Sequence, residues 1–245
     1  MDFIPHFNEL RRRLLLCFAV FLAASIVSYF YSHAIFDFLT QPLRQTTHPA
    51  QLFFQKPYEA FLIRIKVAAF SGFLAAAPVI LSQLWFFIAP GLYEKEKRVF
   101  IPVILISIVL FWAGVIFCDV FVIPWGLGFM LAFQTDTLKP MLAVGPYFSF
   151  LIGMMISFGV LFDFPVFLVG IVELGLVQTK TLAKSRRPII VVIFIVAAIL
   201  TPSPDPVSQI LLAAPLLLLF EISLWIAARR EKNAAIQSGA RGRKD

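Results

Sequence analysis

The sequence predicts an all-α polytopic membrane protein with six transmembrane helices. Its 245 residues are 60% hydrophobic and only 14% charged, and they include 28 phenylalanines. The mean hydropathy is +0.89, far above that of a soluble globular domain. The apolar runs are long enough for helices, whereas a transmembrane barrel shows segments of about ten residues that alternate apolar and polar. The composition therefore favours an integral, helical membrane protein.

Windows of about twenty apolar residues give six expected spans, which together form one transmembrane domain over residues 1–228. In chain order, they are Leu14–Tyr31, Phe61–Ile88, Phe100–Pro124, Tyr147–Val172, Ile189–Leu200 and Val207–Ala228. The segment 229–245 is basic and rich in small residues, so we expect a disordered tail there.

The first span follows the arginines Arg11, Arg12 and Arg13, as the apolar part of a secretory signal does. The apolar stretch ends in bulky aromatic residues without a small-residue cleavage pattern, so we expect a retained helix. These aromatic side chains suit the membrane interface, where they form a belt.

The last two spans are shorter than a bilayer requires. Ile189–Leu200 has twelve residues, and this gives about 18 Å of helix against a hydrocarbon core of about 30 Å. In the sixth span, Gln209 and Glu221 confine the uninterrupted apolar part to Ile210–Phe220. Either the bilayer thins locally or neighbouring helices cover the exposed ends, and both arrangements create a place for another molecule to dock.

An even number of spans leaves both termini on one side of the membrane, and most of the 21 lysines and arginines fall on that side. They are Arg11, Arg12, Arg13, Lys95, Lys97, Arg98, Lys180, Lys184, Arg186, Arg187, Arg229, Arg230, Lys232, Arg241, Arg243 and Lys244. The positive-inside rule makes this side cytoplasmic. The net charge of +7 is therefore a topology signal, and we expect no nucleic-acid partner.

Enzyme and metal motifs are absent from the sequence. There is no G-x-S-x-G, no H-E-x-x-H, no phosphate loop and no cysteine pair at metal spacing. Cys17 and Cys118 each lie in an apolar run, which favours packed thiols. His6, His33 and His48 fall in or near expected loops. We expect no catalytic residue, metal or cofactor.

Asp163 is the most unusual residue, because it lies in an otherwise apolar run. An aspartate at the centre of a membrane helix costs roughly 2.5 to 3.5 kcal/mol, so it usually faces a protein interior or a wet cavity. Gln83, Gln209 and Glu221 are the other polar groups at membrane depth. Asp163 either carries a proton or acts with these groups as a polar anchor for the membrane helix of a partner, and both alternatives stay open.

Four motifs appear in order along the chain. They are Glu9-Leu10-Arg11-x-Arg13-Leu14, Pro90-Gly91-Leu92-Tyr93-x-x-Glu96-Lys97-Arg98, Phe158-Gly159-x-x-Phe162-Asp163-x-Pro165, and Thr201-Pro202 followed by Pro204-Asp205-x-x-Ser208-Gln209. Together they resemble the TatC family, the six-span cargo receptors of twin-arginine protein translocases. The family most often has glutamate at the position of Asp163, and Ser203 makes the last connection one residue longer than the family's form.

The resemblance implies a concave bundle that binds the Arg-Arg signal peptide of folded precursors at the cytoplasmic face, through Glu9, Arg11 and Glu96. A carboxylate accepts the planar donor fork of a guanidinium bidentately, and lysine cannot reproduce this geometry.

The resemblance also implies a set of partners and a location. Single-span TatA- and TatB-like subunits would dock near Ile199, Leu200, Thr201 and Asp205, and the proton gradient would drive export. The chain would form a homo-oligomer within the receptor complex, in contact with lipid, in the bacterial plasma (inner) membrane.

Two other classes of function remain. One is a proton-coupled small-solute transporter that uses Asp163, although the paired broken helices of many transporters are missing. The other is an intramembrane enzyme, against which the missing nucleophile and metal motifs count.

Overall fold

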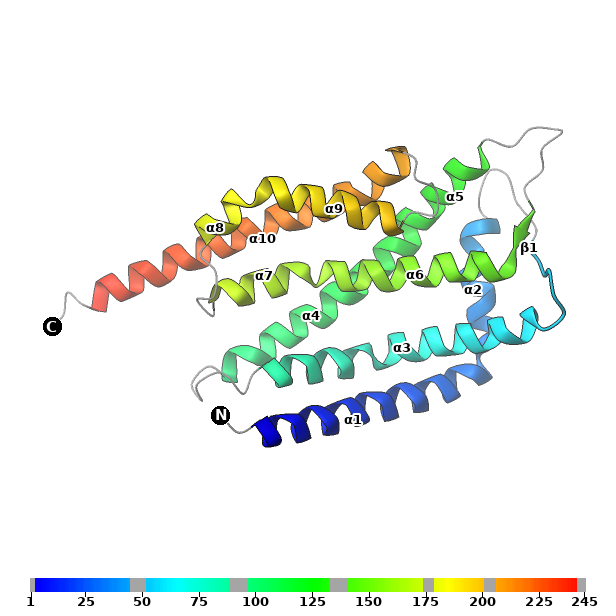
Figure 1. Ribbon diagram of the computed structural model, residues 1–245, viewed down its shortest axis with the longest axis horizontal. Helices are drawn as coiled ribbons and strands as arrows, with labels where there is room; N and C mark the ends of the chain where they lie inside the picture. The colour runs from blue at the N-terminus through cyan, green and yellow to red at the C-terminus, as the bar shows by residue number, and fades with distance from the viewer. Residues whose placement is uncertain are drawn as a thin grey trace. The chain divides into compact units, whose positions relative to one another are not determined.

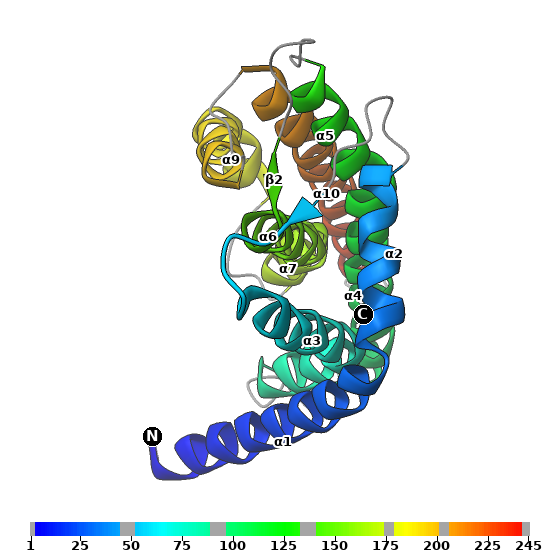
Figure 2. The same ribbon diagram turned by 90° about the vertical axis from the view of Figure 1, so that its right-hand side faces the viewer.

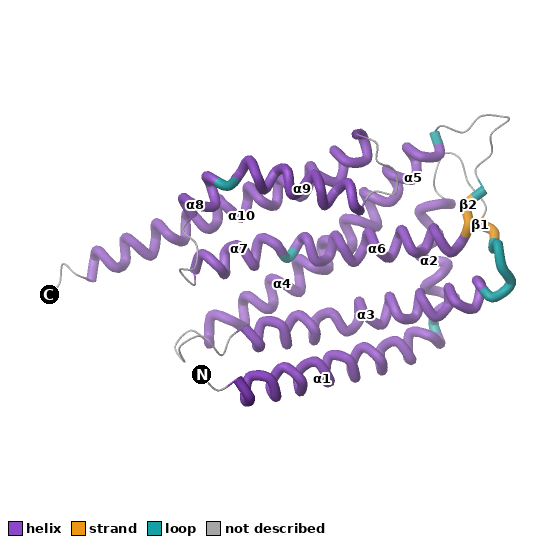
Figure 3. Tube along the Cα trace, in the orientation of Figure 1, coloured by secondary structure: helices purple, strands orange, loops and turns teal. Residues whose placement is uncertain are grey.

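The computed structural model describes residues 3–44, 52–88, 97–132, 141–173, 179–200 and 206–241, and these are almost entirely helical (Figure 3). The contacts divide the chain into two compact units. The first unit is residues 1–109 and 116–155, and the second is 110–115 and 156–245. Hydropathy marks the spans but not which of them pack together, so it gave no sign of this division.

The first unit begins with the helices α1 and α3, which lie side by side (Figures 1 and 2). Its elements are α1 (Phe3–Phe30), α2 (Ser32–Arg44), β1 (Leu52–Phe53), α3 (Glu59–Ile88), most of α4 (Lys97–Phe117), the π-helix η2 (Cys118–Val122), α5 (Ile123–Leu131), β2 (Leu142–Ala143) and the start of α6 (Val144–Phe162).

A glycine permits the close approach of α1 and α3. A Cβ at Gly72 of α3 would lie 2.5 Å from the Cα of Ser25 in α1, so no larger residue fits there. The Ser25 hydroxyl donates to the carbonyl of Phe21 at 2.7 Å and is thus satisfied within its own helix. Small residues let membrane helices pack backbone to backbone. The contact sets the register that brings the start of α1 beside the end of α3.

The opposite end of the first unit is closed by α2 and α6. The Tyr147 hydroxyl donates to the carbonyl of Leu39 at 3.0 Å, and the rings of Phe36 and Phe148 stack with centroids 4.9 Å apart. Next to them β1 pairs with β2 in parallel, with Leu52 opposite Leu142. Two-residue strands are too short to show an alternating pattern, so they cannot be predicted from hydrophobic periodicity.

The second unit contains the remaining part of α6, α7 (Phe164–Glu173), α8 (Thr179–Lys184), α9 (Arg186–Leu200) and α10 (Pro206–Arg241), with residues 110–115 of α4. Here α4 and α6 meet closely, because a Cβ at Gly114 would lie 2.5 Å from the carbonyl oxygen of Phe158. Leu168, Phe220 and Leu224 are buried between α7 and α10 and form the core.

Among the described residues, five helices are long and apolar enough to cross a membrane. They are Phe7–Phe30, Glu59–Phe87, Ile101–Leu131, Val144–Gly170 and Leu212–Arg229. They overlap five of the six expected spans, and the third continues past Pro124 to Leu131. The expected fifth span lies in α9, whose 15 residues measure about 22 Å.

The end of α10 differs from the expectation. The helix continues to Arg241, through most of the segment 229–245 for which we expected a disordered tail. The sequence after Ala228 is rich in arginine, glutamate, lysine, alanine and glutamine, which are all good helix formers. Intrinsic propensity therefore favours continuation of the helix beyond the apolar part.

Candidate functional site

A polar cluster lies where the start of α1 meets the end of α3. The guanidinium of Arg13 donates to Glu9 Oε1 from Nη2 at 2.6 Å and from Nε at 3.1 Å. Its Nη1 donates to Gln83 Oε1 at 3.0 Å, and its Cζ lies 5.9 Å from the ring centroid of Phe86. Thus α1 places Glu9 and Arg13 one turn apart, while α3 supplies an amide and a ring that hold the arginine.

The cluster lines a hollow of about 510 Å³, together with Asn8, Arg12 and Leu16. The Glu9 side chain is 35% exposed and the Arg13 side chain 23%, so a molecule from solution can reach both. Both bonds from Arg13 end on Oε1 of Glu9, and among the described residues no hydrogen bond ends on Oε2. The carboxylate can therefore accept a second guanidinium while Arg13 stays in place.

Two predicted signal-peptide residues are not part of this cluster. Arg11 is exposed on α1 and lies outside the lining of the hollow. Glu96 and most of its motif lie outside the described residues. The structure therefore brings Glu9 together with Gln83, which the sequence had placed in a different group, the polar residues at membrane depth.

Asp163 lies in the short interruption between α6 and α7 (Figure 3), and only 1% of it is exposed. Its backbone forms hydrogen bonds with residues of both helices. The amide donates to the carbonyl of Val160 at 3.1 Å, and the carbonyl accepts from the amides of Val166 and Phe167 at 3.0 and 3.2 Å. Pro165 has no amide hydrogen and cannot donate a backbone hydrogen bond in a continuous helix. The break at this point therefore leaves no proline donor unsatisfied. The break thus places a carboxylate in the interior of the second unit.

Gln209 and Glu221 each bind within the second unit. Gln209 Nε2 donates to the carbonyl of Phe194 at 2.9 Å, which ties the start of α10 to α9. Glu221 Oε2 accepts from Arg186 Nη2 at 3.0 Å, and both side chains are about half exposed. Both residues stabilise the packing of α9 against α10 in this chain.

The predicted partner-contact residues fall at the end of α9. Ile199 is 77% exposed, and Leu200 is the last residue of the helix. Thr201 and Asp205 lie outside the described residues.

The sequence predicts neither of two further features. The first is the pairing of Arg186 with Glu221, because these residues are 35 positions apart and meet only where α9 and α10 pack together. The second is Asp119, which lies within the π-helix η2, and whose Oδ1 is buried without a hydrogen-bond partner among the described residues. A carboxylate inside the third expected span was visible in the sequence and marks such a position. No group of three metal-ligating side chains occurs in the part of the chain that the structure describes.

Comparison with known proteins places these features in a family. The family model described as the Sec-independent protein translocase protein (TatC) matches residues 5–215. The protein of that name from Magnetococcus marinus is 38% identical over 97% of this chain and 88% of its own length. The one from Aquifex aeolicus is 37% identical over 95% of this chain and 98% of its own length.

The fold agrees with the sequence comparison. A crystal structure of the twin-arginine translocase receptor TatC in the detergent DDM superimposes with a TM-score of 0.82 and 37% sequence identity. The match covers 91% of this chain and 99% of that one. The helical fold, the Glu9 cluster and the break at Asp163 thus occur in a chain that belongs to the TatC family, and so in a component of a protein translocase rather than an enzyme.

Proposed function

We propose that this chain is the receptor and core subunit of a twin-arginine translocase, and that Glu9 and Glu96 bind the two arginines of a signal peptide. The Glu9 cluster is the observation that carries the proposal. There, a guanidinium already binds this carboxylate through two of its nitrogens, beside an amide acceptor and an aromatic ring, in a hollow open to solution. Because these groups already bind the guanidinium of Arg13, we infer that the same carboxylate can bind the guanidinium of a signal-peptide arginine.

The basic surroundings supply selectivity. Arg12 and Arg13 line the same hollow, and more lysines and arginines follow in the segments that we expect on the same side of the membrane. A generally cationic segment is repelled by this surface at long range. A segment that places its arginines directly on the two carboxylates recovers charge-assisted hydrogen bonds, so repulsion and attraction together select the Arg-Arg sequence.

A charge reversal at Glu96 tests this electrostatic selection. Glu96→Lys should reduce the binding of an Arg-Arg precursor far more than Glu96→Gln does. Lysine adds a repulsive charge, whereas glutamine only removes the charge of the acceptor. The measurement is photo-crosslinking of the precursor to each variant in native membranes. Equal loss of crosslinking in the two variants would contradict the role of charge.

We further propose that single-span partner subunits meet the exposed end of α9 around Ile199, and that Asp163, which is buried in the chain by itself, becomes a polar contact for a partner helix when the subunits assemble. Hydrogen bonds between membrane helices contribute about 0.6 to 2 kcal/mol each, which suits an assembly that recruits its partners on demand. The complex would lie in the bacterial inner membrane with both termini of this chain in the cytoplasm, and the proton gradient would drive export.

A further inference from the structure

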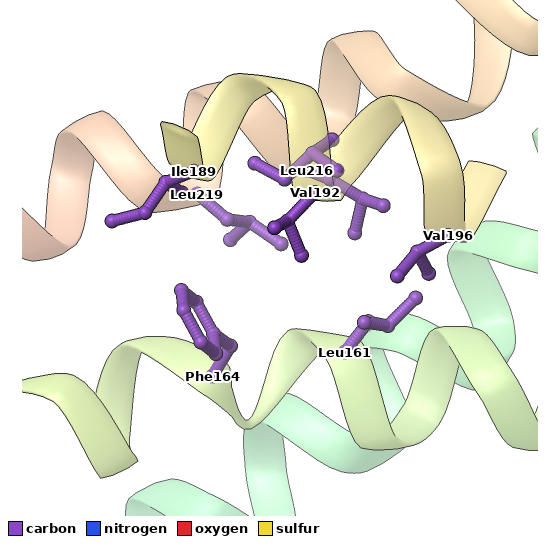
Figure 4. A pocket seen from close by; sticks show the side chains of 8 residues that line it. Leu161, Phe164, Ile189, Val192, Val196, Leu216 and Leu219 are labelled. Carbon is purple, nitrogen blue, oxygen red and sulfur yellow. The ribbon is translucent and has the colours of Figure 1, made fainter. Parts of the chain in front are cut away.

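An apolar pocket of about 220 Å³ lies within the second unit. In Figure 4 the side chains of Val192 and Val196 in α9 face Leu161 and Phe164 across it, and Leu216 of α10 lies behind them. Every lining residue is aliphatic or aromatic. An apolar cavity of this kind does not hold ordered water, since it offers no polar partners.

The pocket follows α9 and reaches the molecular surface. Its lining on α9 runs from Ile189 to Val196, about 10 Å along the helix axis. Val192 is 54% exposed and Phe164 is 39% exposed, so this side opens outward. A single hydrocarbon chain can lie along this apolar lining and follow the axis of α9.

Basic residues lie at one end of the pocket. Arg186 begins α9, one turn before Ile189, and it is exposed together with Lys184 and Arg187. Arg186 binds Glu221 through Nη2, but a guanidinium has five N–H donors and can bind a phosphate oxygen as well. Basic groups beside membrane helices recognise anionic lipid headgroups. Three cations with one carboxylate leave this end positive.

We propose that the pocket binds one acyl chain of an anionic phospholipid, whose phosphate lies at Lys184, Arg186 and Arg187. Arg186 lies about one helical turn before Ile189, the first lining residue of α9. A lipid parallel to the helices would therefore place its phosphate beside Arg186 and its acyl chain in the pocket. The proposal needs only that the second unit lies in a bilayer, and it is independent of signal-peptide binding.

A photoreactive phospholipid tests the acyl-chain site. The full-length chain is reconstituted alone in phosphatidylcholine vesicles that carry phosphatidylglycerol with a diazirine on the acyl chain. We expect adducts on peptides that contain Leu161, Val192 and Leu216, and we expect Val192→Trp to remove them by filling the pocket. Val191→Trp is the matched control, because Val191 is equally exposed, at 57%, but does not line the pocket. Equal loss in both variants, or no adduct on these peptides, overturns the proposal.

Headgroup selectivity needs a second pair of variants. Arg186→Gln should lower the preference for phosphatidylglycerol over a matched phosphatidylcholine by about fivefold, the effect of one basic residue near an anionic surface. Glu221→Gln breaks the same ion pair but keeps the cation, so it should preserve or raise that preference. If both variants lower it equally, or the wild-type chain labels equally with both lipids, the anionic lipid is ruled out.

Discussion

Replacing Glu9 with glutamine should weaken the binding of an Arg-Arg signal peptide by roughly ten- to a hundredfold. A hydrogen bond to a charged group is worth about 1.5 to 3 kcal/mol, and 1.4 kcal/mol is a factor of ten. Glutamine keeps the size of the side chain and one acceptor oxygen but loses the charge. The measurement is the dissociation constant of a fluorescent signal peptide for the purified chain in nanodiscs.

Asp37→Asn is the matched control for this effect. Asp37 is also an acidic residue paired with an arginine, Arg44, at 3.4 Å, but it lies on α2, beyond the far end of α1. Its neutral variant should bind the peptide as the wild-type chain does. The thermal midpoint of Glu9→Gln should stay near that of the wild-type chain, because Arg13 keeps Gln83 and Phe86 as neighbours. Equal peptide affinity of Glu9→Gln and the wild-type chain would contradict the proposed role.

Replacing Asp163 with lysine should abolish export and prevent stable accumulation of the chain. The Asp163 side chain is 1% exposed. An unpaired cation buried at this position would lower the free energy of unfolding by several kcal/mol. Asp163→Asn should behave differently, because an amide of the same size keeps the polar contacts of an anchor. We expect it to accumulate normally, to co-purify with the single-span subunits and to retain most of its export.

The asparagine variant also separates the two roles open to Asp163. If the residue has to carry a proton, Asp163→Asn keeps its assembly but loses export, which contradicts a role as a polar anchor. Ser223→Ala serves as the control, since Ser223 is another fully buried polar residue of the second unit, and its hydroxyl binds its own helix at Leu219. This variant should keep both assembly and export.

Local patterns in the sequence predicted most of the helices. Long apolar runs located five spans, and the shortness of Ile189–Leu200 agrees with the 15 residues of α9. Hydropathy does not predict where α10 ends, because its last residues have low hydrophobicity but high helix propensity. The pairing of β1 with β2 escaped because two residues carry no period.

Only part of the candidate site can be predicted from the sequence, because some of its contacts lie within one helix and others join two helices. Glu9 and Arg13 are four residues apart on one helix, so their pairing follows from helix geometry. Gln83 lies 70 residues from Arg13, and its position depends on the register that Gly72 sets between α1 and α3. The pair of Arg186 and Glu221 likewise depends on how two helices pack. Contacts within a helix could be predicted, whereas contacts between helices needed the structure.

The most direct test of the receptor function is site-specific photo-crosslinking from the hollow itself. A photoreactive amino acid at Asn8 or Leu16, which both line it, is exposed to a twin-arginine precursor and to the same precursor with Lys-Lys. We expect the Arg-Arg precursor to be labelled about tenfold more strongly, because lysine cannot offer the planar donor fork to a carboxylate. Equal labelling of the two precursors would contradict the assignment of this site to the signal peptide.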